Sequence, residues 1–166
     1  MAFSDDPALN EVAKAASRNR LAILFGSGVS RESFAELPAG LSDLQGWVGL
    51  LALLVQRAEA ASGVSHEDLR LAVEDIEKAR RKETVNLLET ASILREATSE
   101  QWIREQISAL LQTAHQAGAH SSTIHKALAS LPGASFFTTN YDDYFERAWQ
   151  DRTGQSMRVV LPNEPA

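Results

Sequence analysis

Two short segments, far apart in the chain, carry the side chains that can do chemistry. The first reads Gly26-Ser-Gly-Val-Ser30 and the second reads Thr138-Thr-Asn-Tyr-Asp142. Each follows an apolar run that ends abruptly in small or polar residues. Ligands of open parallel sheets bind outside the carboxyl ends of the strands, so both segments stand where a ligand would lie. The pair predicts a nucleotide site with a reactive polar group beside it.

The first segment has the composition of a phosphate-binding loop. Gly26 and Gly28 permit a positive φ and a close backbone approach, so backbone N–H groups up to Ser30 can hold a pyrophosphate. The dinucleotide fingerprint G-x-G-x-x-G is incomplete, because Arg31 occupies the third glycine position. The hydroxyls of Ser27 and Ser30 can bind phosphate or ribose. The alternatives are a simple tight turn for the loop and a helix N-cap for Ser30.

Three apolar runs predict the strands that must position these segments. Residues 21–25 form a continuous apolar run, which is typical of a strand buried on both faces. Residues 134–137 and 157–161 predict a second and a third strand. Because helical patterns separate the strands, we expect an α/β fold with a parallel sheet and right-handed crossovers.

Helical periodicity surrounds and separates these runs. Asp5, Asp6 and Pro7 predict the start of a first helix. Apolar spacing and capping residues predict further helices over residues 42–55, 65–76, 85–94, 99–111, 124–131 and 144–149. Most of these lie between the first two strands. We therefore expect a helical insertion of roughly residues 42–118, packed against or over the site, with Trp47 in its core.

Composition and charge limit the classes of function. The 166 residues suffice for one domain or most of one. A net charge of −6 disfavours a general nucleic-acid binder, since phosphate binding needs a basic surface. The absence of cysteine excludes disulfides and thiolate metal sites. No signal-peptide pattern is present, and the longest apolar stretch, residues 47–55, is too short to span a bilayer. We expect a soluble cytoplasmic protein with no membrane or direct nucleic-acid partner.

Both polar segments resemble motifs of the bacterial SIR2-like domains, which are relatives of the sirtuins. The loop from Gly26 to Ser30 is similar to that family's glycine-alanine-glycine-x-serine loop. Residues 138–142 closely resemble its threonine-threonine-asparagine-tyrosine-aspartate motif. Matching residues also flank the two motifs: Leu37-Pro38, Trp47, His125-Lys-Ala-Leu128 and Phe145-Glu-Arg-Ala148. The resemblance runs from about Ala22 to the C-terminus.

The resemblance implies a Rossmann-like NAD-binding core. Sirtuins use this core for NAD-dependent deacylation, whereas many bacterial SIR2-like proteins hydrolyse NAD+, often as abortive-infection effectors against phage. The second activity is favoured, because a motif with Tyr141 is similar to the bacterial defence branch rather than to the deacetylases. The zinc-binding cysteines of many deacetylases have no counterpart here. We therefore expect the full-length parent protein to be an NAD+ glycohydrolase, with NAD as the substrate and with nicotinamide and ADP-ribose as products.

The family's functional residues carry over to the matching positions. Asn140 is expected to orient the nicotinamide ribose and the attacking water; a carboxamide, which donates, accepts and does not titrate, suits this role. Asp142 is expected to contact the carboxamide of nicotinamide. The resemblance implies a cofactor-binding set of Gly26, Ser27, Gly28, Ser30, Thr139, Asn140 and Asp142. For Asn140 and Asp142, the alternative is an Asx-turn or a helix N-cap.

The part of the family pattern that holds the catalytic histidine has no counterpart. That histidine lies downstream of the asparagine motif, whereas none of the four histidines here follows Asn140. They show no metal-ligand spacing, so we expect surface or structural roles and no metal. The strands expected for the adenosine end of NAD also have no counterpart. We therefore expect a partial SIR2-like domain over residues 1–166, with the C-terminal part of the fold missing and little catalysis by this chain alone.

Two other classes of function remain open. One is a non-catalytic module that binds NAD or ADP-ribose, or that holds a partner through the helical insertion. The other is an NAD-dependent protein deacylase. SIR2-like effectors commonly oligomerise, and residues 47–55 are more apolar than one covered helix face requires. The expected partners are therefore NAD+ together with further copies of the chain or a fused or partner sensor domain.

Overall fold

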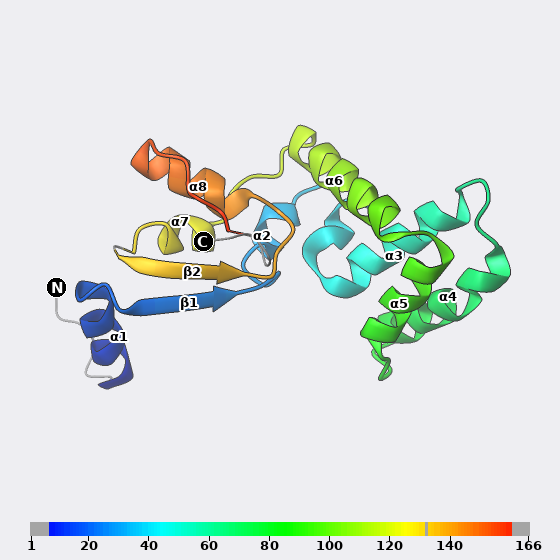
Figure 1. Ribbon diagram of the computed structural model, residues 1–166, viewed down its shortest axis with the longest axis horizontal. Coiled ribbons are helices and arrows are strands. Elements are labelled where there is room, and N and C mark those ends of the chain that lie inside the picture. Colours follow the sequence, from blue (N-terminus) through cyan, green and yellow to red (C-terminus); the bar gives the residue numbers. More distant parts are fainter. Residues whose placement is uncertain (1–6, 132, 161–166) are drawn as a thin grey trace. The chain divides into compact units, whose positions relative to one another are not determined.

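The computed structural model describes residues 7–131 and 133–160. Within them the chain is mixed α/β, with mostly helices and one two-stranded parallel sheet. It divides into two compact units (Figure 1). Among the described residues, the sheet unit combines residues 7–30 with residues 121–131 and 133–160, and the helical unit spans residues 31–120. The helical unit contains the range 42–118 that the sequence analysis assigns to an insertion.

The sheet unit is built from two strands and three helices within the described residues. Its elements are α1 (Pro7–Ser17), β1 (Leu21–Phe25), α7 (Thr123–Leu128), β2 (Ala134–Thr138) and α8 (Tyr144–Thr153). The strands are parallel, in register from Leu21 opposite Ala134 to Phe25 opposite Thr138. This confirms both predicted strands and their parallel pairing. A helix from Pro7 is confirmed as well, while its predicted caps, Asp5 and Asp6, lie outside the described residues.

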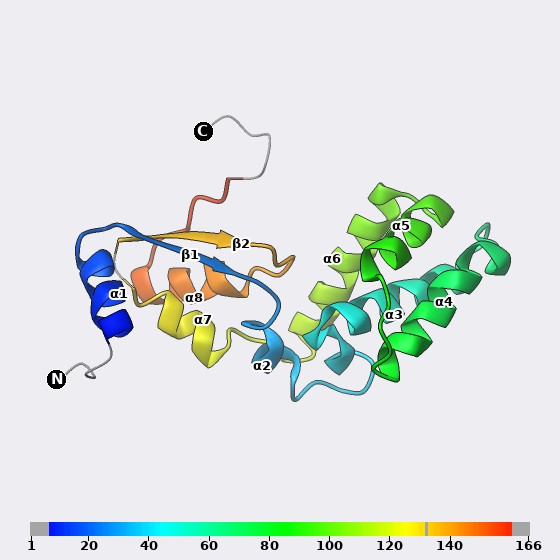
Figure 2. The ribbon, with the colours of Figure 1, turned by 90° about the horizontal axis from the view of Figure 1, so that it is seen from below.

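One face of the sheet carries the core of this unit. Figure 2 shows α7 and α8 on the same side of the two strands. The ring of Phe145, on α8, lies 5.1 Å from the ring of Phe25 and 4.7 Å from that of Phe136. Ala129 and Ala148 complete the buried part of the cluster. Because aromatic rings bury the most apolar area per residue, these contacts hold α8 against the strands.

No described helix covers the opposite face of the sheet. Leu24 is 75% exposed, and its register partner Phe137 is 58% exposed. Successive side chains of a strand point to opposite faces, so helices packed on one side leave the alternate residues uncovered. The prediction that residues 21–25 are buried on both faces is therefore wrong within the described part of the chain.

The predicted third strand does not form over the residues that can be described. Residues 157–160 have no strand conformation, and Leu161 lies outside the described range. Val159 and Val160 are exposed. A β-branched run becomes a strand only where a neighbouring backbone pairs with it, and in the described structure this run has no such partner. Gly154 ends α8 in the left-handed conformation, which glycine adopts without a steric penalty.

The helical unit consists of five α-helices and one 3₁₀ helix in its described residues. These are α2 (Arg31–Phe34), the 3₁₀ helix η1 (Ser42–Gln45), α3 (Trp47–Glu59), α4 (His66–Arg80), α5 (Leu87–Ala97) and α6 (Glu100–Gln116). Its buried apolar residues are mainly aliphatic and include Leu51, Leu54, Val55, Leu69, Ile76, Leu94 and Leu110. No described helix of the chain combines the length and apolarity needed to cross a membrane.

Two helices of the helical unit begin at the capping residues that the sequence predicts. One predicted helix, in contrast, is interrupted. Ser65 accepts a hydrogen bond from the N–H of Glu67, and Ser99 accepts one from the N–H of Trp102. The single helix predicted from residue 42 to 55 is interrupted by extended backbone at Gly46. Trp47 starts α3 and is 39% exposed, so its predicted place in the core is wrong.

Candidate functional site

The loop after β1 folds as two overlapping turns. The N–H of Val29 donates to the carbonyl of Gly26 over 3.0 Å, and the N–H of Ser30 donates to the carbonyl of Ser27 over 3.1 Å. These two N–H groups are therefore engaged inside the loop and are not free for a pyrophosphate. Ser27 and Gly28 are exposed, and their N–H groups make no hydrogen bond within the described residues.

The structure does not support the positive φ that the sequence analysis expected at the two glycines of this loop. Neither Gly26 nor Gly28 adopts a positive φ. Gly26 lies against the residue after β2, since a Cβ there would stand 3.1 Å from Oγ1 of Thr139. A Cβ on Gly28 would meet no described heavy atom within 4 Å. Close packing thus accounts for Gly26, whereas Gly28 faces open space.

The loop after β2 runs beside the glycine loop. The N–H of Thr139 donates to the carbonyl of Phe25 over 3.2 Å, which extends the contact between the strands by one bond. The chain then enters α8, where the N–H of Tyr144 donates to Oδ1 of Asp142 over 3.3 Å. Asp142 therefore forms the Asx-type turn that the sequence left open as its alternative role. The side chain of Asn140 makes a different contact.

The buried side chain of Ser30, in the first loop, contacts side chains of the second loop. Nδ2 of Asn140 donates to Oγ of Ser30 over 2.8 Å. Oγ of Ser30 donates to Oδ2 of Asp142, also over 2.8 Å. Nε2 of His125 lies 3.3 Å from the same oxygen. The structure thus brings together three residues predicted for the site and adds one that was not.

His125 belongs to the network through the start of α7. Ser122 caps this helix: its Oγ accepts from the N–H of His125 over 3.1 Å and donates to the carbonyl of Val29 over 2.8 Å. In return, the N–H of Ser122 donates to Nδ1 of His125 over 3.0 Å. This is a capping box with histidine in the place of the usual Glu or Gln. Because Nδ1 accepts a hydrogen bond, the neutral ring carries its proton on Nε2, which donates to Ser30.

Sequence reasoning correctly gave His125 a structural role but missed its connection to the site. The spacing from Ser122 to His125, that of a capping box, was the available signal. His66, His115 and His120 lie on exposed positions in the helical unit. In the described part of the chain, no three His, Asp or Glu side chains gather as metal ligands.

The carboxylates around this network are partly withdrawn from water. Burial raises the pKa of Asp142, and the hydrogen bonds from Ser30 and from the N–H of Tyr144 act in the opposite direction. Burial also raises the pKa of Glu146, in the first turn of α8. Burial and then the nearby Asp142 raise the pKa of Tyr144 to about 12. The phenol of Tyr144 is therefore neutral at physiological pH.

One atom of the network is left without a partner. Oδ1 of Asn140 is buried and accepts no hydrogen bond from any described residue. Its orientation follows from Nδ2, which is held by Ser30. An unpaired buried acceptor costs about 1–3 kcal/mol, so such an atom marks a place where a water or a ligand group is expected.

No family model, no curated protein and no solved structure matches this chain.

The pair Ser30 and His125 does not form a nucleophile with its base. Ser30 is 1% exposed and its proton is directed to Asp142. In a nucleophilic triad the carboxylate orients the histidine and the histidine takes the serine proton. Here the carboxylate contacts the serine, and Nδ1 of the histidine is occupied by a backbone N–H. The network is suited to holding groups in place rather than to covalent catalysis.

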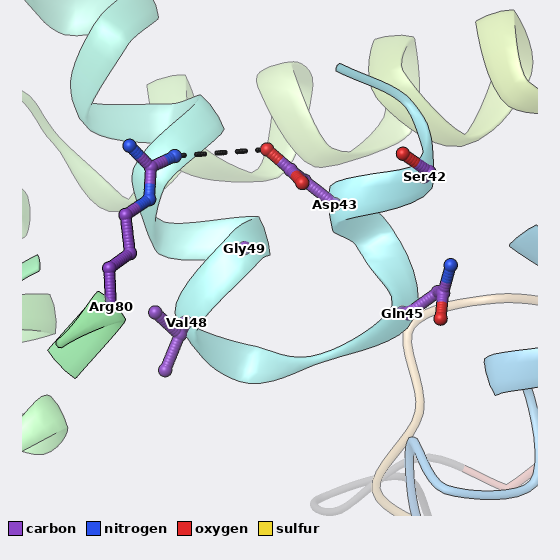
Figure 3. Close-up of a pocket in the computed structure, with 6 residues that line it drawn as sticks. All are labelled: Ser42, Asp43, Gln45, Val48, Gly49 and Arg80. Atoms are coloured by element: carbon purple, nitrogen blue, oxygen red, sulfur yellow. Dashed lines mark ion pairs between the residues drawn. The ribbon is translucent and has the colours of Figure 1, made fainter. Parts of the chain in front are cut away.

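The helical unit has a hollow of its own, of about 350 Å³. It is lined by Ser42, Asp43, Gln45, Val48, Gly49 and Arg80. Figure 3 shows Arg80 reaching from α4 toward Asp43, with 3.7 Å between their charged atoms. Both side chains are about half-exposed, so the pair is screened by water and contributes little stability. The hollow contains none of the residues predicted for the nucleotide site.

Proposed function

We propose that this chain is a SIR2-like NAD-processing domain. The reaction proposed for the protein is hydrolysis of NAD+ to nicotinamide and ADP-ribose, in an anti-phage abortive-infection role. The observation that carries the proposal is the unpaired Oδ1 of Asn140, oriented by Ser30 at the ends of two parallel strands. Further copies of the chain, or a sensor domain, are the proposed partners.

The proposed chemistry needs positioning more than acid–base strength. Water attacks C1′ of the nicotinamide ribose, the C1′–N bond breaks, and nicotinamide leaves with the bonding electron pair, which neutralises its pyridinium charge. The water loses a proton to solvent. The oxocarbenium-like transition state is favoured when the ribose and the water are held in line. Oδ1 of Asn140 is an acceptor for a ribose hydroxyl or for the attacking water.

The positions of the other predicted site residues are compatible with binding of NAD+. Ser27 and Gly28 are exposed residues whose N–H groups have no partner among the described residues, and a Cβ on Gly28 would meet no described heavy atom within 4 Å. Each oxygen of Asp142 accepts one hydrogen bond from the chain. A carboxylate has about four acceptor positions, so Asp142 retains capacity for the carboxamide of nicotinamide.

The arrangement of the strands supports a Rossmann-like sheet as the finer description of the fold. The two loops that carry the motifs follow the carboxyl ends of neighbouring parallel strands. Ligands of doubly wound sheets bind at this edge. A Rossmann-like core is therefore part of the proposal, since two strands by themselves are common to many α/β folds.

A binding module without turnover is the second candidate. The site side chains form hydrogen bonds with one another or with backbone N–H groups, as seen for Ser30, Asp142 and His125. A network whose donors are bonded internally favours a rigid binding surface over a site that must exchange protons. In this case NAD+ or ADP-ribose is held at the same loops and is released unchanged.

The test measures binding of NAD+ and ADP-ribose by calorimetry, together with nicotinamide release, for the wild-type chain and for Asn140→Ala. Asn86→Ala, at an exposed position in the helical unit, is the matched control. We expect nucleotide binding by the wild type and the control, weakened about tenfold or more in Asn140→Ala. Absence of binding by the wild type would contradict both candidates.

Turnover separates the remaining alternatives. The same assay is run on the chain and on any longer natural protein that contains it. Nicotinamide release that is lost in Asn140→Ala supports the hydrolase. Binding without release supports the module. Release that requires an added acylated peptide would identify a deacylase instead.

A further inference from the structure

His125 is a fully buried imidazole that the proposed reaction does not use directly. Its two ring nitrogens contact two different elements. Nδ1 accepts from the N–H of Ser122 at the start of α7, and Nε2 lies 3.3 Å from Oγ of Ser30 at the end of the glycine loop. A buried ring that is bonded at both nitrogens has a fixed orientation and a fixed tautomer.

The hydrogen-bond capacity of Ser30 shows what this ring does. A hydroxyl has one proton and two lone pairs. The proton goes to Oδ2 of Asp142, and one lone pair accepts from Nδ2 of Asn140. The remaining lone pair accepts from Nε2 of His125. With all three positions filled, the hydroxyl cannot rotate without breaking a buried hydrogen bond.

We infer that His125 is a positioning residue, which locks the hydroxyl of Ser30 and thereby holds the amide of Asn140 with Nδ2 bonded and Oδ1 unpaired for a ligand. The inference rests on the proposed function only for the identity of that ligand. The orientation of the amide is a property of the chain itself. His125 thus links the cap of α7 to the ends of both strands.

A variant separates this role from that of a helix cap. Gln at the third helical position completes a capping box, because its side-chain oxygen accepts from the N–H of the cap residue. His125→Gln therefore retains an acceptor for Ser122 but removes the ring N–H that points to Ser30. His66→Gln makes the same chemical change at an exposed position near the start of another helix, α4, and is the matched control.

The test is NMR on the whole ¹⁵N-labelled chain, without nucleotide. We expect the ring of His125 to carry its proton on Nε2 and to have an unprotonated Nδ1. We also expect the side-chain amide of Asn140, assigned through its loss in Asn140→Ala, to exchange slowly with water. In His125→Gln this exchange should accelerate by about fivefold or more, as expected for one buried hydrogen bond, while the amides of α7 remain protected. His66→Gln should match the wild type.

Two results would overturn the inference: a proton on Nδ1 of His125, or an Asn140 amide that exchanges equally slowly in a folded His125→Gln. If His125→Gln does not fold, Ser30→Ala decides instead. The Nε2 resonance should then shift and the Nδ1 resonance should stay, and an unshifted Nε2 would contradict the role.

Titration of the same samples with NAD+ tests the proposed function separately from the positioning role of His125. The affinity for NAD+ should fall about fivefold in His125→Gln and remain unchanged in His66→Gln. If the wild-type chain does not bind NAD+, the proposed function is wrong. The NMR results then still confirm or overturn the positioning role by themselves.

Discussion

Asn140 donates to Ser30 over 2.8 Å, across 110 positions of the sequence. The bond joins the loop after β2 to the loop after β1, and it decides which end of the Asn140 amide is engaged. The amide nitrogen is satisfied, and the amide oxygen is buried without a partner. This single relationship makes the two polar motifs one site.

The direction of this bond predicts the effect of an isosteric change. Asn140→Asp replaces the donor with an oxygen that faces Ser30 and lies close to Asp142. We expect a loss of about 1–3 kcal/mol in the free energy of unfolding at pH 7, and a smaller loss in acid, where a protonated carboxyl restores a donor. Urea denaturation at both pH values measures this. Asn86→Asp, at an exposed position, should stay close to the wild type, and equal stability of Asn140→Asp at pH 7 would contradict the assigned orientation.

The two glycines of the first loop should respond differently to alanine. Gly28→Ala introduces a methyl group into open space, so the free energy of unfolding should change by no more than about 0.5 kcal/mol. If phosphate approaches there, the affinity for NAD+ should fall about tenfold. Gly26→Ala presses on Thr139 and should cost about 1 kcal/mol of stability. Calorimetric titration and urea denaturation test the pair; wild-type affinity in Gly28→Ala would exclude this loop as the phosphate site.

The core of the sheet unit depends on Phe145. Phe145→Ala removes a buried ring that contacts Phe25 and Phe136, and should cost about 3–5 kcal/mol. Phe137→Ala removes a ring from the open face and should cost about 1 kcal/mol or less. Denaturation followed through the amide signals of β1 and β2 compares the two. Similar losses would mean that the open face is covered in solution.

Burial of Asp142 predicts a pH dependence of stability. Its pKa is raised above the ordinary value of 3.8, so between that value and the raised pKa the folded state binds more protons than the unfolded state. The contribution of Asp142 to the free energy of unfolding therefore falls as pH rises through this window. In Asp142→Asn the dependence should be weaker, with the contribution of Glu146, of the same sign, still present.

Urea denaturation in half-unit steps of pH across this window measures the slope. Asp151→Asn removes an exposed carboxylate near the end of α8 that is not among the groups that shift the pKa of Asp142 or Glu146, and it should preserve the wild-type slope. Identical slopes for Asp142→Asn and the wild type would show that Asp142 is not withdrawn from water in solution.

The helical unit contains a position where only glycine fits. A Cβ on Gly49 would lie 1.8 Å from the backbone oxygen of Asp43, which cannot move without displacing η1. We expect Gly49→Ala to lower the free energy of unfolding of this unit by more than about 3 kcal/mol. Gly46→Ala has open space and an extended backbone that any residue adopts, so it should be tolerated. Thermal unfolding followed by the amide signals of α3 distinguishes the two, and a wild-type melting temperature for Gly49→Ala would contradict the close approach.

Much of the local structure was determined by the sequence alone. The apolar runs at residues 21–25 and 134–137 formed strands, and Ser65 and Ser99 capped helices as predicted. Gly154 ended α8. These features depend on a residue and its neighbours within one or two turns, so their signals lie in short stretches of sequence. The positions of both polar motifs, directly after strands, followed from the same local signals.

Only the tertiary structure decided which strands pair, which side chains are buried and which distant side chains come into contact. The run at residues 157–160 remained without a strand, and Leu24 and Phe137 came to lie on an open face, because pairing and cover depend on what packs beside a strand. The contact of His125 with Ser30 joins residues 95 positions apart. The orientation of the Asn140 amide and the raised pKa of Asp142 likewise follow from burial among distant residues, which the motifs themselves do not specify.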